Sequence, residues 1–167
     1  MLAVIDRLTA PSRAPWLIGA VAVACLIGAV VLEYGFGVAP CVLCLWQRVP
    51  WALALALAVA GVSPLGRGWA LPWLLAVVGT GFLAGTGVAV FHIGIQNHWW
   101  AGTPACGVPA LATTIEDLRA QLLAQPVVRC DEVNWSLFGL SLPVYNALLS
   151  LPLALLALVA ARRAAAR

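Results

Sequence analysis

Lysine is absent from this chain of 167 residues, and charged residues of all kinds make up only 9% of it. Soluble domains carry roughly 25% charged residues, so this scarcity argues against a soluble fold. A nucleic-acid-binding surface is excluded too, because the net charge of +3 comes from a few arginines that flank apolar stretches. Hydrophobic residues reach 63%. The sequence therefore predicts an integral membrane protein in a lipid bilayer.

Four apolar stretches are long enough to cross a bilayer, which takes about 20 predominantly apolar residues. They cover approximately residues 16–34, 43–62, 69–91 and 142–161. None has the amphipathic pattern of a helix that covers a soluble core. We therefore expect an all-α fold in which residues 1–167 form one polytopic membrane four-helix bundle. A long, more polar loop over residues 92–141 separates the third stretch from the fourth.

The arginines predict the orientation of the bundle. Six of them lie in the termini and in the short connection between the second and third stretches, whereas the other side holds three arginines and five acidic residues. By the positive-inside rule both termini are cytoplasmic and the long loop is periplasmic. Tryptophans predict an aromatic belt at each interface. Those assigned to the cytoplasmic belt are Trp16, Trp69 and Trp73, and those assigned to the outer belt are Trp46, Trp51, Trp99, Trp100 and Trp135.

Processing of the first stretch is a weaker alternative. Gly37-Val38-Ala39 resembles the small-residue site of a cleavable signal peptide, but the apolar run before it is too long and Pro40 follows the cut. Lipid modification of Cys41 is disfavoured because the same proline directly precedes it. We therefore expect residues 16–34 to remain as a membrane span.

Four of the five cysteines fall on the outer side in this topology: Cys41, Cys44, Cys106 and Cys130. The bacterial periplasm is oxidising, so these four can form two disulfides. Cys25 lies in the middle of the first span and is interpreted as a small apolar filler.

Cys41 and Cys44 form a C-x-x-C, a spacing that brings two sulfurs together on a helical turn and lowers a thiol pKa. A zinc site would need further ligands from Cys106 and Cys130, whose separation is not that of a second C-x-x-C. Haem attachment needs a histidine at the position of Leu45. Disulfide chemistry is therefore the favoured interpretation, with no metal expected.

Arg48 follows Cys44 by four positions and Cys41 by seven, so a helix places all three on one face. One explanation is simple snorkelling of the guanidinium toward the interface. The other is catalytic, because a fixed cation one turn from a thiol favours the thiolate and could stabilise an oxyanion on a bound acceptor. Pro50 removes a backbone hydrogen bond just below and could open the helix for a flat ligand.

His92 directly follows the third stretch, at the same outer level as Arg48, where an imidazole could donate a hydrogen bond to a quinone carbonyl. His98, beside two tryptophans, is expected to be interfacial. In the same stretch Gly81 and Gly85 have the small-xxx-small spacing of a close helix contact.

The loop contains a capping box, Thr113-Thr114-Ile115-Glu116, which predicts a short amphipathic helix over 113–123. That helix could lie on the membrane surface or pack on the bundle. A disulfide between Cys106 and Cys130, on either side of it, could simply staple the loop. Two disulfide-capable pairs on one side of the membrane instead suggest a relay.

The chain resembles the disulfide bond formation protein B family over most of its length. The residues that carry the resemblance are Pro40–Cys44 with Arg48, His92, Cys106, Cys130-Asp131, Trp135 and Phe138–Pro143. The resemblance implies a protein-disulfide:quinone oxidoreductase of the bacterial inner (plasma) membrane. Two departures stand out: Gln47 replaces an acidic residue of some relatives, and the segment Gly107–Pro109 has no match.

The resemblance also implies the disulfides Cys41–Cys44 and Cys106–Cys130 and a DsbA-like periplasmic dithiol oxidase as partner. The partner's thiolate would attack Cys106, Cys130 would then exchange with Cys41, and Cys44 would be released. Arg48 and His92 would hold ubiquinone or menaquinone beside Cys44, which would pass on electrons through an adduct or a charge-transfer contact. A relay of this kind is established as what keeps the bacterial periplasm oxidising.

Two rival functions remain at this point. Vitamin K epoxide reductases also combine four helices with a C-x-x-C, but theirs lies late in the bundle, whereas here it opens the second span. A membrane scaffold with purely structural disulfides would have the same cysteines and no turnover.

Overall fold

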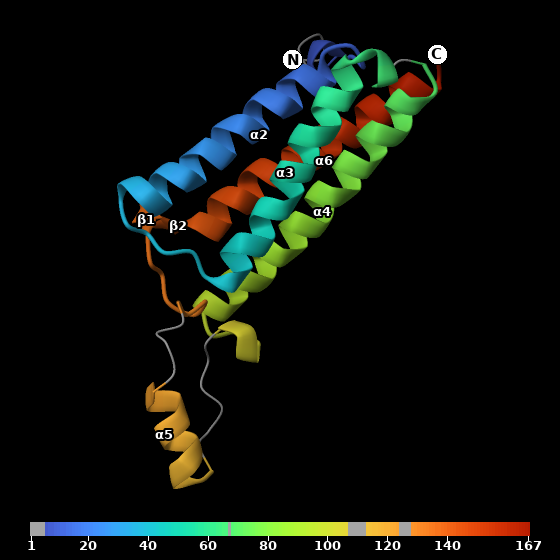
Figure 1. Cartoon of the computed structure of the whole chain (residues 1–167). Helices are drawn as coiled ribbons and strands as arrows, with labels where there is room; N and C mark the ends of the chain where they lie inside the picture. The colour runs from blue at the N-terminus through green and yellow to red at the C-terminus, as the bar shows by residue number, and fades with distance from the viewer. Residues whose placement is uncertain (1–5, 67, 107–112, 124–127) are drawn as a thin grey trace.

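The computed structural model describes residues 6–66, 68–106, 113–123 and 128–167. Four long helices form a bundle, with both chain termini at the same end (Figure 1). Each is long and apolar enough to cross a membrane, with mean hydropathy between 1.7 and 2.4. Their bounds are α2 (Ala14–Val30), which continues as the π-helical turn η1 (Val31–Gly35), α3 (Val42–Val62), α4 (Ala70–Gln96) and α6 (Leu142–Ala165). The predicted polytopic helical bundle is confirmed.

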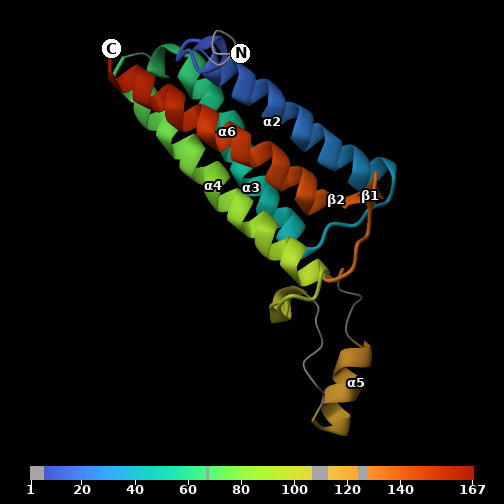
Figure 2. The same ribbon diagram turned by 180° about the vertical axis from the view of Figure 1, so that it is seen from behind.

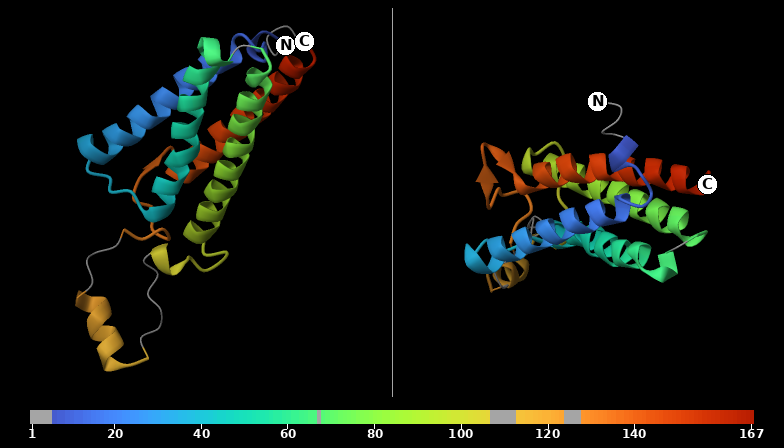
Figure 3. Two further views of the ribbon diagram at one scale, coloured as in Figure 1. Left: turned by 45° about the vertical axis from the view of Figure 1, so that its right-hand side comes forward. Right: turned by 90° about the horizontal axis from the view of Figure 1, so that it is seen from above.

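Small side chains let these helices approach one another closely. Most of the buried core at the end near the termini is alanine, packed around the larger Ile18 and Phe82. The helices α4 and α6 pack most extensively, followed by α3 with α4 and α2 with α3. Contact between α2 and α6 is sparse, and α2 diverges from α3 and α4 toward its C-terminal end (Figure 3). Helix α2 is therefore the least tightly packed of the four at the end away from the termini.

Gly85 provides the close helix contact that the glycine spacing predicts. A Cβ atom at this position would lie 2.9 Å from Cγ of Pro50 in α3, whereas one at Gly81 would be in ordinary contact with Leu53. Overpacking of this kind typically costs about 1–3 kcal/mol. Gly85 therefore allows the proline ring of α3 to lie against α4.

Gly85→Ala is expected to lower the stability of the bundle in detergent by about 1–3 kcal/mol. Gly87→Ala is the matched control, because a Cβ there meets nothing within 4 Å and brings the same gain in helix propensity. Denaturation curves of the two variants measure the difference. Equal stability would show that Pro50 moves aside without cost.

The third span extends beyond its predicted end at residue 91 to Gln96. Polar residues continue the helix because they find partners: Gln96 accepts a hydrogen bond from Ser141 at 2.7 Å. The helix ends at Gln96, with Asn97 as its C-cap, and His98 follows with a φ of 58°, a left-handed conformation common after a helix. His92 therefore lies within the last turns of α4 and not after them, and the loop begins at Asn97.

A two-stranded hairpin precedes α6 and was not predicted from the sequence. It pairs β1 (Ser136–Leu137) with β2 (Leu140–Ser141). The connecting residues Phe138 and Gly139 both have positive φ, at 49° and 77°, as the tight turns that match strand twist require. The hairpin joins the loop to the start of α6 (Figure 1).

The predicted loop helix is present as α5 (Ile115–Leu123). It lies well beyond the end of the bundle in opposite views (Figures 1 and 2), so packing of α5 on the bundle is not observed. The capping register differs from the prediction by one residue, since Thr114 accepts the Asp117 backbone N–H at 3.0 Å. Two short 3-10 turns complete the described elements, η2 (Pro64–Gly66) and η3 (Pro104–Cys106). Arg67 and Gly107–Pro109 lie outside the described residues.

Candidate functional site

A buried cluster of sulfur-containing side chains lies at the end of the bundle away from the termini. Cys41 directly precedes α3, Cys44 lies in its first turn, Cys106 ends η3, and Cys130 belongs to the returning loop. Cys106 and Cys130 are fully buried and Cys41 is 2% exposed. All three pack in one cluster, and Cys44 lies against it. The fold thus brings together the four cysteines that the sequence places on the outer side.

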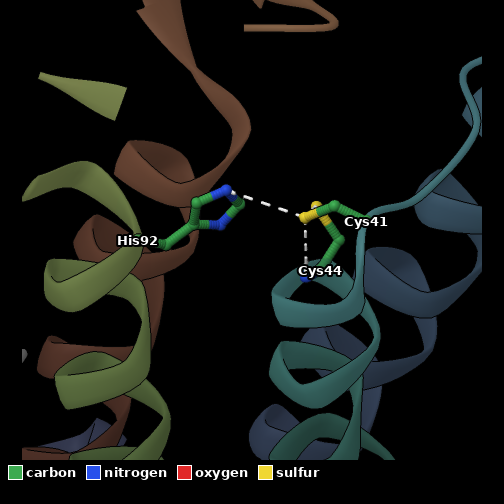
Figure 4. Close-up of side chains that lie close together, drawn as sticks. All are labelled: Cys41, Cys44 and His92. Atoms are coloured by element: carbon green, nitrogen blue, oxygen red, sulfur yellow. Dashed lines mark hydrogen bonds between the residues drawn. The ribbon is translucent and has the colours of Figure 1, made fainter. Parts of the chain in front are cut away.

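Cys41 is the hydrogen-bond acceptor of its pair. It caps α3, with its Sγ accepting the Cys44 backbone N–H at 3.3 Å. The Sγ atoms of Cys41 and Cys44 are 2.9 Å apart, and Nε2 of His92 approaches Cys41 to 3.7 Å (Figure 4). Hydrogen bonds from the Cys44 side chain and from His92 hold the pKa of the Cys41 thiol far below its ordinary value, although burial opposes them. The anion of the reduced pair therefore belongs on Cys41.

Cys106 and Cys130 form the second pair. The Cys130 backbone N–H donates to the Cys106 carbonyl at 3.2 Å. Burial raises the pKa of the Cys130 thiol, and a hydrogen bond with the Cys106 side chain raises it further. All five cysteines are free thiols in the structure, so the disulfides Cys41–Cys44 and Cys106–Cys130 stay predictions.

These opposite shifts predict distinct pH profiles for alkylation of the fully reduced protein. Only the thiolate reacts, so the normalised rate at Cys41 should stay high at neutral pH and fall only in acid. The rate at Cys130 should rise only in alkali. Peptide mass spectrometry after timed alkylation would measure both profiles within one sample. Coincident profiles would contradict the assignment of the anion to Cys41.

A chain of buried polar side chains extends from His92 into the bundle. His92 is 1% exposed and Gln47 6% exposed. The amide nitrogen of Gln47 lies 3.0 Å from His92 Nδ1, and Asn146 of α6 donates to Gln47 Oε1 at 2.6 Å. Trp51 in turn donates to Asn146 at 2.8 Å. The side chain of His92 is therefore held from both of its ring nitrogens, because Nε2 also lies 3.2 Å from the Cys130 carbonyl.

The sequence alone does not reveal most of this series of hydrogen-bonded polar side chains. The prediction that Trp51 belongs to the outer aromatic belt is wrong: it is 5% exposed and packs edge-on against Phe82 at 4.8 Å. The sequence marks Gln47 only as a departure from relatives, and no motif points to Asn146. A signal was available, because amides inside apolar spans are costly and usually functional.

Arg48 forms an ion pair that the sequence also left unassigned. Its guanidinium donates to Oε2 of Glu33 at 2.6 Å, and both side chains keep partial exposure, 28% and 22%. Glu33 lies in the π-helical turn η1, a feature that often marks functional sites. Since its charge has a partner, Arg48 is not an isolated cation beside the thiols.

A cavity of about 270 Å³ opens beside the C-x-x-C, lined by residues of α2, α3, α4 and α6 and of the adjoining loops. Its polar wall includes Cys44, Arg48 and His92. Its apolar wall includes Leu26 of α2, Leu32 of η1 and Leu149 of α6. An apolar ligand with one polar end suits such a cavity.

The same thiols are also compatible with a soft metal ion. The sulfurs of Cys41 and Cys44 and a ring nitrogen of His92 lie within 4.8 Å of one another. Zinc in structural sites takes four such ligands, and this group offers three. Ligation by His92 would require an unprotonated nitrogen facing the sulfurs.

Fold and site together define a polytopic helical membrane protein with its cysteines gathered at one end of the bundle. The family model described as disulfide bond formation protein DsbB matches residues 11–160. A disulfide bond formation protein B of Chromohalobacter salexigens is 33% identical over 163 residues, covering 88% of this chain and 91% of the relative. That of Neisseria gonorrhoeae is 32% identical, covering 81% of this chain and 85% of the relative. That of Xanthomonas campestris is 30% identical, covering 89% of each.

The chain belongs to the DsbB family. No solved structure matches it. Family membership makes it a disulfide-forming oxidoreductase of a membrane, and the gathered cysteines are the groups available for that chemistry.

Proposed function

We propose that this protein is a membrane thiol oxidase that reoxidises a DsbA-like periplasmic dithiol oxidase and passes the electrons to a membrane quinone. The observation that carries the proposal is the single cluster in which Cys41, Cys106 and Cys130 pack together, with Cys44 against them and its Sγ 2.9 Å from that of Cys41. Thiol–disulfide exchange needs sulfurs that can reach one another. The bundle is proposed to lie in the bacterial inner membrane, with its termini cytoplasmic and the cysteine cluster at the periplasmic side.

The proposed exchange begins at Cys106. A partner thiolate attacks its sulfur in the Cys106–Cys130 disulfide, forming a partner–Cys106 disulfide and releasing Cys130 as a thiolate. Because Cys106 is fully buried, this step requires the segment Pro104–Cys106 to move outward.

Cys130 then attacks Cys41, so that the Cys41–Cys130 bond forms, the Cys41–Cys44 bond breaks and Cys44 leaves as a thiolate. The partner's second thiolate resolves the first mixed disulfide and departs oxidised, freeing Cys106. Cys106 then attacks Cys130, so that the Cys41–Cys130 bond breaks, the Cys106–Cys130 disulfide is restored and Cys41 leaves as a thiolate. Cys41 and Cys44 are then both reduced. The two electrons of the partner dithiol now reside on Cys41 and Cys44. The two protons that the partner thiols release balance the negative charge.

The residues around the cavity fit a quinone, ubiquinone or menaquinone. Cys44 faces a cavity whose walls are mainly apolar, as a ring with a hydrocarbon tail requires, and Arg48 supplies a cation at its polar end. When bound, a quinone takes up two electrons and two protons. Arg48 would stabilise negative charge on Cys44 and on the ligand oxygen, while Glu33 fixes the position of the guanidinium.

Trapping of free thiols in membranes tests the proposal against a scaffold with structural disulfides. Cells depleted of quinone but supplied with reduced partner should accumulate free thiols on this protein. Addition of quinone should remove them within the turnover time. Cysteines that stay oxidised under depletion would identify structural bridges and overturn the proposal.

A further inference from the structure

The buried polar chain has a fixed direction, and both of its ends define it. At one end the Trp51 indole is a donor only, so the atom of Asn146 that it contacts must be the amide oxygen. The amide nitrogen of Asn146 then donates to Gln47 Oε1, which leaves the Gln47 nitrogen to donate to His92 Nδ1. Nδ1 is thus the acceptor of the imidazole.

The other end imposes the same direction independently. A backbone carbonyl only accepts, and the Cys130 carbonyl lies 3.2 Å from His92 Nε2. Nε2 must therefore carry the proton. The Sγ of Cys41 lies 3.7 Å from that same nitrogen and is already an acceptor of the Cys44 N–H. One N–H is shared between a carbonyl and a sulfur.

We propose that Trp51, Asn146 and Gln47 are positioning residues that keep the proton of His92 on Nε2 and aim it at the Cys41 sulfur. Among the described residues, no buried side-chain nitrogen or oxygen lacks a partner, so reversing one amide would break bonds along the whole chain. The Trp51 end alone suffices to keep the proton on Nε2, because Trp51, Asn146 and Gln47 orient one another up to Nδ1. The N–H therefore stays available to the Cys41 sulfur whatever the position of the Cys130 carbonyl.

This role differs from a direct contact between His92 and a quinone. Both ring nitrogens are engaged, so a hydrogen bond to a ligand would have to replace one of the existing partners. The arrangement also disfavours a metal ion at Cys41, Cys44 and His92, since ligation needs the lone pair of the nitrogen that carries the proton. The consequence for Cys41 rests on the proposed function, but the position of the proton does not.

Nitrogen-15 NMR of the full-length protein tests the position of the proton. The chain has two histidines, so a His98→Asn background isolates His92, and asparagine tolerates the left-handed backbone of residue 98. We expect a protonated Nε2 and an unprotonated Nδ1. Asn146→Asp should reverse the Gln47 amide, because an ionised carboxylate only accepts, and should therefore place a proton on Nδ1.

Gln96→Glu is the matched control, because it adds a carboxylate in the same helix as His92 but outside the polar chain. It should keep the original pattern. A proton on Nδ1 of His92 in the His98→Asn background would overturn the proposal. So would a His92 proton that stays on Nε2 alone in Asn146→Asp. If Asn146→Asp fails to fold, Gln47→Glu provides the same test, since its carboxylate also demands a proton on Nδ1.

Alkylation of Cys41 tests where the N–H is aimed, without quinone or partner. His92→Phe should slow alkylation of reduced Cys41 at neutral pH about tenfold or more, the usual effect of losing a hydrogen bond to a charged group. The His98→Asn background should react normally. An unchanged rate in His92→Phe would refute the link to Cys41, whereas failure of quinone reduction with these results intact would refute only the proposed function.

Discussion

Cys106→Ala is expected to abolish thiol exchange with the DsbA-like partner, by more than about 100-fold in rate, while a small dithiol still reduces quinone through the protein. The sulfur that the partner is proposed to attack is lost, but Cys41, Cys44 and the cavity should keep their arrangement. A small dithiol can reduce the C-x-x-C directly, because that step needs no loop cysteine. Partner oxidation and dithiol-driven quinone reduction, assayed side by side on purified protein, measure the two activities.

Cys130→Ala is the informative companion to this variant. It leaves Cys106 as a thiol without its loop partner, so the Cys106 thiolate can attack the disulfide of the oxidised partner, breaking that bond and forming a partner–Cys106 disulfide. After acid quenching, this covalent complex should be detectable on non-reducing gels. Cys106→Ala should form no such complex. A parallel loss of both activities in Cys106→Ala would refute the division of labour between the two pairs.

Arg48→Ala is expected to raise the quinone concentration required and to slow turnover, lowering kcat/KM for quinone by about 10- to 100-fold. The lost guanidinium would otherwise bind a ligand oxygen and the Cys44 thiolate. The fold should persist, because partly exposed ion pairs contribute little, about 0–1 kcal/mol, and the Arg48–Glu33 pair is of that kind. Steady-state kinetics at several quinone concentrations, with circular dichroism of the purified variant, test both statements.

Glu33 supplies the control for this experiment. Arg48→Ala strands the Glu33 carboxylate beside the cavity, and its repulsion alone could weaken the binding of an electron-rich ligand. The double variant Arg48→Ala/Glu33→Gln removes that charge, so kinetics that stay slow assign the loss to the cation. Recovery to the original rate would assign the effect to the stranded carboxylate and contradict a direct role of Arg48.

The spans and the C-x-x-C were predictable because they depend on local properties. Hydropathy marks a membrane helix wherever it occurs, and the spacing of Cys41 and Cys44 determines their contact within one helical turn. The extension of α4 to Gln96 was not predictable in this way, because the partner that satisfies Gln96 is Ser141, 45 positions away. Helix ends that depend on tertiary contacts are hidden from local patterns.

The same reason explains what was missed at the site. Asn146 and Gln47 are 99 positions apart in sequence, and Trp51 and Asn146 are 95 apart. Nothing in the sequence of either helix indicates which face meets the other. Arg48 could be predicted as a site residue from its helical register with the cysteines. Its pairing with Glu33 could not, because Glu33 lies in a π-helical turn, which changes the direction in which the side chains at the end of α2 point.

The cap that Cys41 provides for α3 has a consequence for the oxidising power of the C-x-x-C. A thiolate accepts the Cys44 N–H much better than a sulfur in a disulfide does, so the helix end favours the reduced pair. A side-chain cap is worth about 0.5–2 kcal/mol, which corresponds to about 10–40 mV for a two-electron couple. In the proposed relay, helix α3 would therefore make a Cys41–Cys44 disulfide easier to reduce, which would favour transfer of electrons to it from the loop cysteines.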